Sequence, residues 1–359
     1  MRRSQLGLFA AQRPQPASVT ASVRRTGPIL SMVENRNYAL DLLRAIGALA
    51  VVTQHMHYDG LPNWATDALF LCARWAVPFF FLASGYFFEK GSRQHLDRQF
   101  LKTLKGLLNI CVVANLFYFF LAVQTKYYSL SDLLSVKTLL LGDYIHLWFL
   151  GSLIFAYLVL WLILSTNQSR LLPMAALLTG AFALLAGPYS VFTRFGIEGD
   201  FARFLLSIPF LFTGFLFSRH KLAHRLGKAG SIALATAGLL LQFLEAHFIA
   251  GQNSDLRNSP EIFLGTFGLS VGLFAFSFHV NMAKDNILSV IGRNYSLTIY
   301  LYHPALVLII FFIIKRMGWQ PPYYLLWFNA FTVFLCTLLL IKLTARLSPR
   351  FFKVINGDF

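Results

Sequence analysis

The feature that most constrains this chain is a succession of long apolar runs that are almost free of charged residues. A helix that crosses a bilayer needs about 20 apolar residues. Hydrophobic residues make up 57% of the chain and charged residues only 13%, about half the charged share of a typical soluble domain. The sequence therefore predicts an all-α polytopic membrane protein with about ten transmembrane helices. The expected segments are approximately 40–58, 69–88, 106–123, 146–164, 171–187, 205–218, 230–249, 262–280, 296–314 and 323–344.

The basic residues lie mainly between these segments. The chain has 31 Lys and Arg against 15 Asp and Glu, and ten spans would place 22 of the basic residues on the side of the termini and seven on the other side. Such an excess is typical of cytoplasmic loops. We therefore expect both termini in the cytoplasm. Because topology explains the positive charge, we expect membrane lipid around the protein and no nucleic-acid partner.

Three regions differ in composition. Residues 1–35 are rich in Ser, Arg and Pro, and this predicts a disordered basic N-terminal extension without the apolar region of a secretory signal. We expect one transmembrane domain over residues 36–345 and a basic cytoplasmic tail over residues 346–359. The three cysteines stand alone in apolar runs, so no metal site is expected.

Ionisable residues concentrate in the first predicted helix. An ionisable side chain inside a span costs about 2.5–3.5 kcal/mol on insertion scales, so each one is a candidate for function. Arg44 and His55 are eleven residues apart, which is close to three helical turns and places both on one face, about 16 Å apart. Asp41 precedes Arg44 by three residues, a spacing that allows an ion pair.

This spacing places two side chains with different chemical uses on one face of the helix. The Arg44 guanidinium offers a fixed fork of donors for phosphate or carboxylate. Burial favours the neutral form of an imidazole, so His55 could accept a proton from a hydroxyl. Alternatively, Arg44 is only a positive-inside anchor and His55 only bonds a neighbouring helix. The shared stripe of Asp, Arg and His favours the functional interpretation.

Four segments carry a family resemblance. Arg44 and His55 form an Arg-x10-His pattern within a first helix that begins Leu40-Asp41-Leu-Leu-Arg44. The other three segments are 74–88, 146–150 and 291–304, which contain Arg-Trp-Ala-Val-Pro, His-Leu-Trp-Phe-Leu and Ile-Gly-Arg-Asn-Tyr-Ser-Leu-Thr-Ile-Tyr-Leu-Tyr-His-Pro. Together they resemble the acyltransferase 3 family over about residues 36–345, although the late motif has its Tyr and Ser in exchanged order. The chain is similar to stand-alone members that O-acetylate polysaccharides such as enterobacterial common antigen.

The resemblance implies a membrane-bound O-acyltransferase of the bacterial inner membrane. Such an enzyme moves an acyl group, usually acetyl, from cytoplasmic acyl-CoA to a hydroxyl of a glycan or lipid-linked saccharide, with no tightly bound cofactor. His55 would be the general base or a transient acyl carrier, and Arg44 would orient the thioester or stabilise the oxyanion. Asp41 would support Arg44. The competing function class is a secondary transporter or flippase that uses the intramembrane Asp, Arg and His residues.

Arg98, Lys102 and Lys105 follow the second predicted span, on the side expected to be cytoplasmic, and are candidates for binding acyl-CoA. Relatives commonly have Arg-x-x-Arg near this place, so Lys102 and Lys105 depart from the pattern. The same loop could be basic for topological reasons alone.

Further candidates lie towards the opposite side. His146, Trp148 and Arg74 could bind the acceptor, since an aromatic ring beside polar groups suits a sugar. An interfacial aromatic belt or a lipid headgroup would explain Trp148 and Arg74 equally well. His303 and Tyr302 lie within the ninth span and could support the site, or His303 could be a structural histidine beside Pro304.

Overall fold

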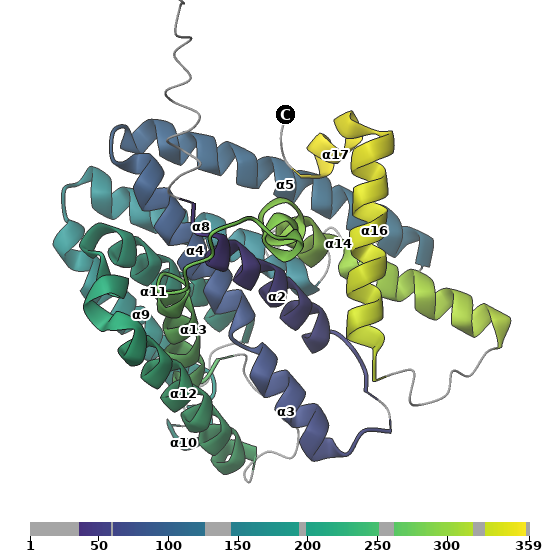
Figure 1. Cartoon of the computed structure of the whole chain (residues 1–359), viewed down its shortest axis with the longest axis horizontal. Helices are drawn as coiled ribbons and strands as arrows, with labels where there is room; N and C mark the ends of the chain where they lie inside the picture. The colour runs from purple at the N-terminus through teal and green to yellow at the C-terminus, as the bar shows by residue number, and fades with distance from the viewer. Residues whose placement is uncertain are drawn as a thin grey trace, which may run out of the picture. The chain divides into compact units, whose positions relative to one another are not determined.

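The computed structural model describes residues 36–58, 60–125, 145–193, 199–250, 262–318 and 327–356, and every regular element in these ranges is a helix (Figure 1). The chain divides into two units, Met1–Arg36 and Asn37–Phe359, and the fold described below is that of the second unit. The predicted extension over residues 1–35 lies outside the described residues. The helices are α2 (Tyr38–Gln54), α3 (Asn63–Ala73), α4 (Ala76–Ser92), α5 (Leu96–Thr125), η1 (Ile145–Leu147), α8 (Trp148–Ser165), η2 (Ser169–Leu171), α9 (Leu172–Ala186), α10 (Ser190–Thr193), α11 (Gly199–His220), α12 (Leu222–Ala250), α13 (Leu264–Phe276), α14 (Ile287–Met317), α16 (Asn329–Leu347) and α17 (Pro349–Ile355).

The helices confirm an all-α polytopic membrane protein. Among the described residues, seven helical stretches are long and apolar enough to cross a bilayer, and two shorter apolar helices accompany them. The first predicted span corresponds to α2, which has only 17 residues. All ten predicted segments overlap helices, while the number of ten spans and the side of the termini stay predictions. The seven stretches are Asn63–Ser92, Leu96–Leu121, Trp148–Ser165, Ser169–Ala186, Leu222–Ile249, Ile287–Met317 and Asn329–Leu347.

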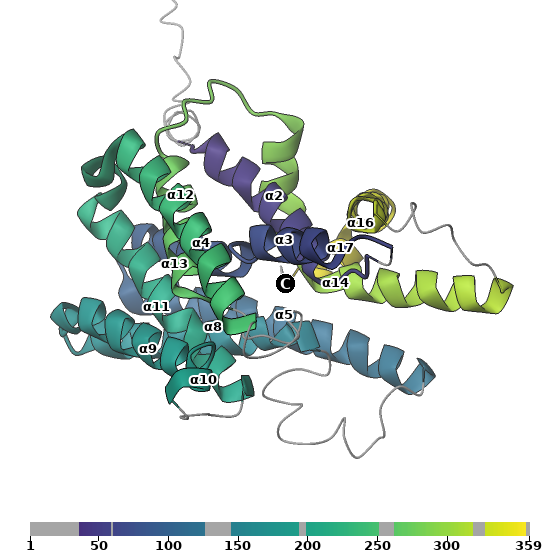
Figure 2. The ribbon, with the colours of Figure 1, turned by 90° about the horizontal axis from the view of Figure 1, so that it is seen from below.

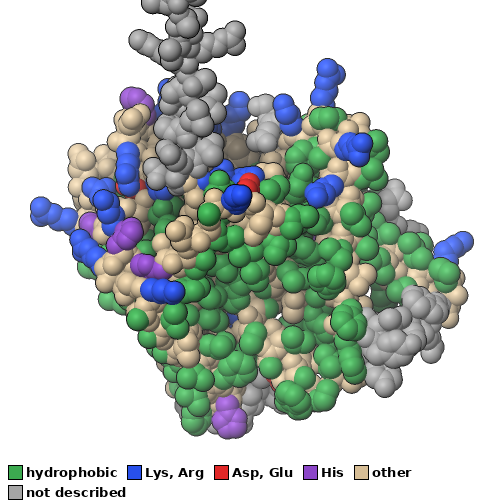
Figure 3. All heavy atoms as spheres, in the orientation of Figure 1, with side chains coloured by type: hydrophobic (Ala, Val, Ile, Leu, Met, Phe, Trp, Pro, Cys, Tyr) green, Lys and Arg blue, Asp and Glu red, His purple; other side chains and the backbone are tan. Residues whose placement is uncertain are grey.

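The surface has the polarity that a bilayer requires. In Figure 3, hydrophobic side chains cover the middle and lower parts of the face, and Lys and Arg side chains gather along its upper edge. Large apolar residues are exposed on several helices, with Leu177 of α9 at 71% and Leu339 of α16 at 65%. A soluble monomer rarely exposes so much contiguous apolar surface. Lipid is therefore the medium that this surface fits.

Two helices that carry candidate site residues, α2 and α14, pack closely against each other. A side chain at Gly292 of α14 would clash with the Asp41 carbonyl oxygen of α2, so the crossing requires a glycine. Asn37 caps α2 by accepting a hydrogen bond from the Leu40 amide at 2.9 Å. Asn286 caps α14 in the same way, with the Ser289 amide at 2.8 Å. The two helices therefore begin side by side.

Helix α14 changes direction along its length. Its first half lies beside α2 and its second half runs off at a steep angle, as Figure 2 shows. Pro304 lies inside the helix. Proline lacks the amide hydrogen that would bond the carbonyl four residues earlier, and its ring crowds that carbonyl. The bend is therefore explained by Pro304, and it occurs next to His303.

Candidate active site

Three histidines from separate parts of the chain meet in one cluster. His55 is the C-cap of α2, His146 lies in η1 and His303 lies in α14. The ring centroids of His55 and His303 are 5.0 Å apart, those of His55 and His146 6.4 Å, and those of His146 and His303 6.1 Å. The sequence suggested different roles for the three residues, whereas the structure brings them together. We call them the histidine cluster.

The bend of α14 orients His303. Pro304 cannot donate a hydrogen bond to the Tyr300 carbonyl, and the His303 Nδ1 takes its place at 2.8 Å, with the Ile299 carbonyl 3.1 Å from the same nitrogen. A carbonyl oxygen only accepts, so Nδ1 carries the hydrogen and Nε2 of the neutral ring has a lone pair. This Nε2 is buried and has no hydrogen-bond partner among the described residues.

The carbonyl of Leu301 holds His146 in place. It accepts hydrogen bonds from the His146 Nε2 at 2.9 Å and from the Tyr118 hydroxyl at 2.7 Å. The Tyr300 hydroxyl in turn donates to the His146 carbonyl at 2.7 Å. All of these residues are buried. Side chain and backbone of His146 are thus both fixed to the segment of α14 that precedes the bend.

His55 is the accessible member of the cluster. Its Nδ1 lies 2.9 Å from the Val51 carbonyl, so Nδ1 donates and Nε2 of the neutral ring is left with a lone pair. Protein atoms crowd the ring, yet the residue is exposed, whereas His146 and His303 are buried. A substrate hydroxyl can therefore approach His55 more readily than the other two histidines. This is the arrangement that a general base needs.

A carboxylate joins two arginines near the start of α2. The Arg44 Nη1 donates to the Asp41 Oδ1 at 3.4 Å, which confirms the pairing that their spacing predicts. The Asp41 Oδ2 lies 3.9 Å from the Arg293 Nη1 of α14, and the Arg293 Nη2 donates to Asp285 at 2.8 Å. Asp41 is buried, and each arginine side chain is 23% exposed. Two partly exposed guanidinium groups are thus fixed together, and Arg293 joins the candidates only through this contact between helices.

A cavity of about 170 Å³ extends from Arg44 to Tyr300. Tyr300 contacts His146 with ring centroids 6.0 Å apart, so the cavity ends beside the histidine cluster. His55 itself is not in the wall. The lining residues are Arg44, Phe80, Ala83, Ser84, Phe87, Thr103, Leu107, Phe149, Leu150, Leu153, Tyr157, Ser296, Leu297 and Tyr300. Arg44 and a residue in contact with the cluster, Tyr300, therefore line the same cavity.

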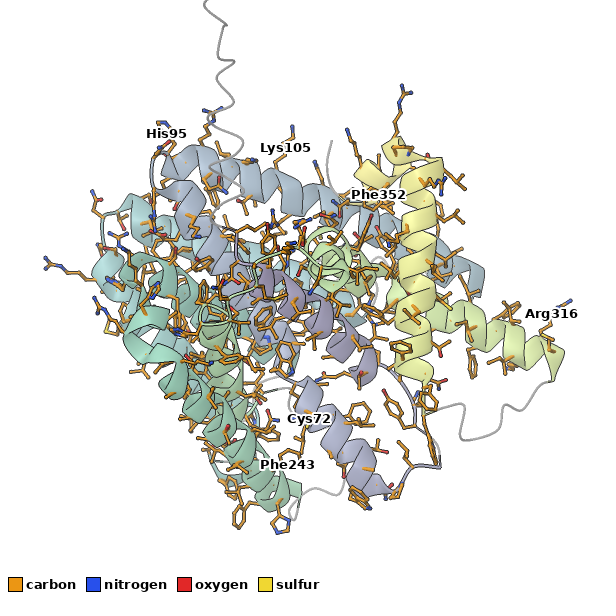
Figure 4. All side chains as sticks on the ribbon, viewed as in Figure 1. Cys72, His95, Lys105, Phe243, Arg316 and Phe352 are labelled. Atoms are coloured by element: carbon orange, nitrogen blue, oxygen red, sulfur yellow. The ribbon has the colours of Figure 1, made fainter. Side chains whose placement is uncertain are left out.

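The candidate residues for acyl-CoA lie outside this cavity. Arg98, Lys102 and Lys105 are exposed on α5 and share one face of the helix. Thr103 and Leu107, which line the cavity, are separated from these three residues by about 100–180° around the same helix. Figure 4 shows the Lys105 side chain pointing away from the other helices, on the edge where His95 also lies.

The structure also places the candidates Trp148, Arg74 and Tyr302. Trp148 is buried at the start of α8. Arg74 is buried as well, and its guanidinium lies 4.8 Å from the Phe263 ring centroid, so it meets an aromatic ring of the protein. The Tyr302 ring contacts Phe117 of α5 at 5.2 Å. In the part of the chain that the structure describes, no group of three His, Cys, Asp or Glu side chains could hold a metal ion.

The residues that sequence reasoning missed follow a helical pattern. Ser296, Tyr300 and His303 are separated by four and three residues, so they share one face of α14. Tyr300 therefore reaches the cluster, while Tyr302 faces another helix. The spacing from His303 was a signal that could have found Tyr300 and Ser296.

Comparison with known proteins agrees with this geometry. The sequence matches the model of the acyltransferase 3 family, described as an acyltransferase domain, over residues 37–341. Neither the curated proteins nor the solved structures give a significant match. The family match covers most of the chain and includes every residue of the histidine cluster. The protein therefore belongs to the acyltransferase 3 family and is a multi-pass membrane acyltransferase that transfers groups other than amino-acyl groups.

Proposed function

We propose that this protein is an O-acyltransferase of the bacterial inner membrane. It transfers an acyl group, with acetyl as the simplest case, from cytoplasmic acyl-CoA to a hydroxyl of a glycan or lipid-linked saccharide. The observation that carries the proposal is the accessible imidazole of His55. Its hydrogen bond to Val51 leaves Nε2 able to take a proton, and the cavity that Arg44 lines is also lined by Tyr300, which contacts the other two histidines.

The proposed reaction uses His55 as base and then as acid. Its Nε2 takes the proton of the acceptor hydroxyl while the hydroxyl oxygen attacks the carbonyl carbon of the thioester. The new C–O bond forms, the C–S bond breaks, and the acyl group passes to the acceptor. The CoA thiolate then takes this proton from the imidazolium and leaves as the thiol. No covalent acyl-enzyme is needed in this route.

The two buried histidines support His55 in this proposal. The His303 ring meets the His55 ring edge-on at 5.0 Å, and His146 is held to the same segment of α14. Each of them has one ring nitrogen bonded to a backbone carbonyl, which holds its ring in place. Both therefore orient the base by packing against it. The acceptor then approaches from the exposed side of His55. His146, a candidate for binding the acceptor, is buried, and its ring centroid lies 6.4 Å from that of His55.

The donor is bound from the Arg44 end. Arg44 and Arg293 offer paired guanidinium groups, which suit the pyrophosphate of CoA. Arg98, Lys102 and Lys105 are proposed to contact the nucleotide phosphates beyond the cavity, since they are exposed on α5, the helix whose Thr103 and Leu107 line the cavity. The phosphates would stay outside the bilayer while the thioester reaches the histidine cluster.

Transfer can be tested with purified protein in lipid nanodiscs. We expect the wild-type protein to release free thiol from acetyl-CoA only when a saccharide acceptor is present, and to yield a product heavier by one acetyl group in mass spectrometry. Surface glycans from a deletion strain should lack an acetyl group that the complemented strain restores. Movement of labelled saccharide across vesicles without any acyl transfer would instead establish the transporter alternative.

A further inference from the structure

Ser296 has a buried hydroxyl that the protein does not satisfy. The residue is 1% exposed, and among the described residues its Oγ has no hydrogen-bond partner. Buried polar atoms in native proteins nearly always have a partner, and leaving one without a partner is destabilising. Ser296 also lies in the wall of the cavity that begins at Arg44. A group that enters this cavity would be able to supply the missing partner.

The rest of the wall indicates what kind of group that is. Between Arg44 and Tyr300 the cavity is lined mainly by apolar side chains such as Leu150, Leu153 and Leu297. A cavity with mainly apolar walls, a guanidinium in its lining and one buried hydroxyl that has no partner among the described residues suits a chain of methylenes that carries a phosphate at its end and an amide along its length.

The position of Ser296 along α14 sets its distance from the histidine cluster. Ser296 and His303 lie on one face of the helix and seven residues apart, which corresponds to about 10 Å along the axis. An acyl-CoA thioester at the histidine cluster has its pantetheine arm running back towards the phosphates. In an extended arm, the second amide from the sulfur lies at a comparable distance from the thioester.

We propose that Ser296 binds the second amide of the pantetheine arm of acyl-CoA, with its hydroxyl donating to the amide oxygen. The cavity then holds the arm, Arg44 marks the end towards the phosphates, and Ser296 sets how far the thioester reaches towards His55. Ser296 is a positioning residue, since it does not touch the reacting atoms. This inference rests on the proposed function, because it takes acyl-CoA as the donor.

The chain offers a matched control. Thr337 of α16 is also buried, and its Oγ1 likewise has no hydrogen-bond partner among the described residues. Thr337 is not in the wall of the cavity. Removing either hydroxyl should have a similar effect on folding, so only a role in donor binding separates Ser296→Ala from Thr337→Val.

Three acetyl donors of decreasing length test the proposal: acetyl-CoA, acetyl-pantetheine and acetyl-N-acetylcysteamine. The last has the first amide of the arm but lacks the second. We expect Ser296→Ala to lower kcat/KM by roughly 2- to 10-fold with the two longer donors, mainly through KM, which is the effect of one hydrogen bond. We expect no change with the shortest donor. Ser296→Thr keeps a hydroxyl and should keep the wild-type pattern, and Thr337→Val should behave as wild type with all three.

Each other result is decisive. Unchanged kinetics of Ser296→Ala with every donor, or an equal loss with every donor, would overturn the assignment of the second amide to Ser296. If Thr337→Val lost as much kcat/KM as Ser296→Ala, the loss would be a general effect of packing, and the assignment would be overturned as well. If the wild-type protein transfers acetyl from none of the donors, the proposed function fails, which is a separate outcome.

Discussion

His55 and His303 lie with their ring centroids 5.0 Å apart, one at the end of α2 and the other at the bend of α14. Each uses Nδ1 to bond a backbone carbonyl of its own helix, so each neutral ring has its lone pair on Nε2. Only His55 is exposed. The difference in access, rather than in tautomer, is therefore what supports the proposed proton transfer at His55.

The first prediction concerns the base. His55→Ala should lower kcat by at least about 100-fold, which is the usual contribution of a general base. Expression and membrane insertion should be retained, because the residue caps α2 through backbone bonds to Val52 and Thr53. His57→Ala is the control, since His57 is exposed two residues later and lies outside the histidine cluster. Acyl transfer at the wild-type rate in His55→Ala would exclude the proposed mechanism.

The second prediction concerns the bend. Pro304→Ala restores an amide hydrogen that competes with His303 for the Tyr300 carbonyl. We expect kcat to fall roughly 10- to 100-fold with little change in donor KM, because a small misplacement of the site is costly. Pro209→Ala, a proline inside α11, is the matched control. Steady-state kinetics on both variants decide this, and an unchanged kcat in Pro304→Ala would show that the bend does not position His303 for catalysis.

The third prediction separates the two groups of basic residues. Arg293→Ala should raise the KM for both acetyl-CoA and acetyl-phosphopantetheine, by roughly 10-fold for a charge-assisted bond to phosphate. Lys102→Gln with Lys105→Gln should raise the KM for acetyl-CoA alone, by roughly 2- to 10-fold, since exposed charges contribute little each. An unchanged KM for acetyl-CoA in the double variant would show that these lysines do not bind the donor and only set the membrane topology.

The fourth prediction concerns the crossing of α2 and α14. Gly292→Ala should lower the thermal unfolding temperature in detergent and reduce activity, because its methyl group clashes with the Asp41 carbonyl. The expected cost is about 1–3 kcal/mol. Gly106→Ala of α5 is the control, because an added Cβ there meets nothing within 4 Å, and alanine favours a helix. Equal unfolding temperatures for the two variants would contradict the close approach.

Local spacing predicted what lies within one helix. The pairing of Asp41 with Arg44 follows from a separation of three residues, and the structure confirms it. The helical class of the chain followed in the same way from the length and polarity of the apolar runs. Both depend on distances along a single helix, which the sequence fixes.

Contacts between helices were not predictable in the same way. His146 reaches His55 only because a carbonyl of α14 holds it, and no periodicity specifies that packing. Arg74 was expected to meet a headgroup or glycan, and the structure places it against Phe263, which is far away in sequence. Tyr302 is the residue next to His303 in sequence, but Tyr300 is the one that reaches the histidine cluster, because the helical face decides which side chains meet it.

The proline within α14 also bears on how such an enzyme could be engineered. A protein selected only for resistance to heat would tend to lose a helix-interrupting proline, since a regular helix is more stable. Here that same change would release the ring of His303 from the carbonyl that orients it. Under the proposed mechanism, thermostabilisation and turnover are thus opposed at a single position, and screens of this enzyme should hold Pro304 constant.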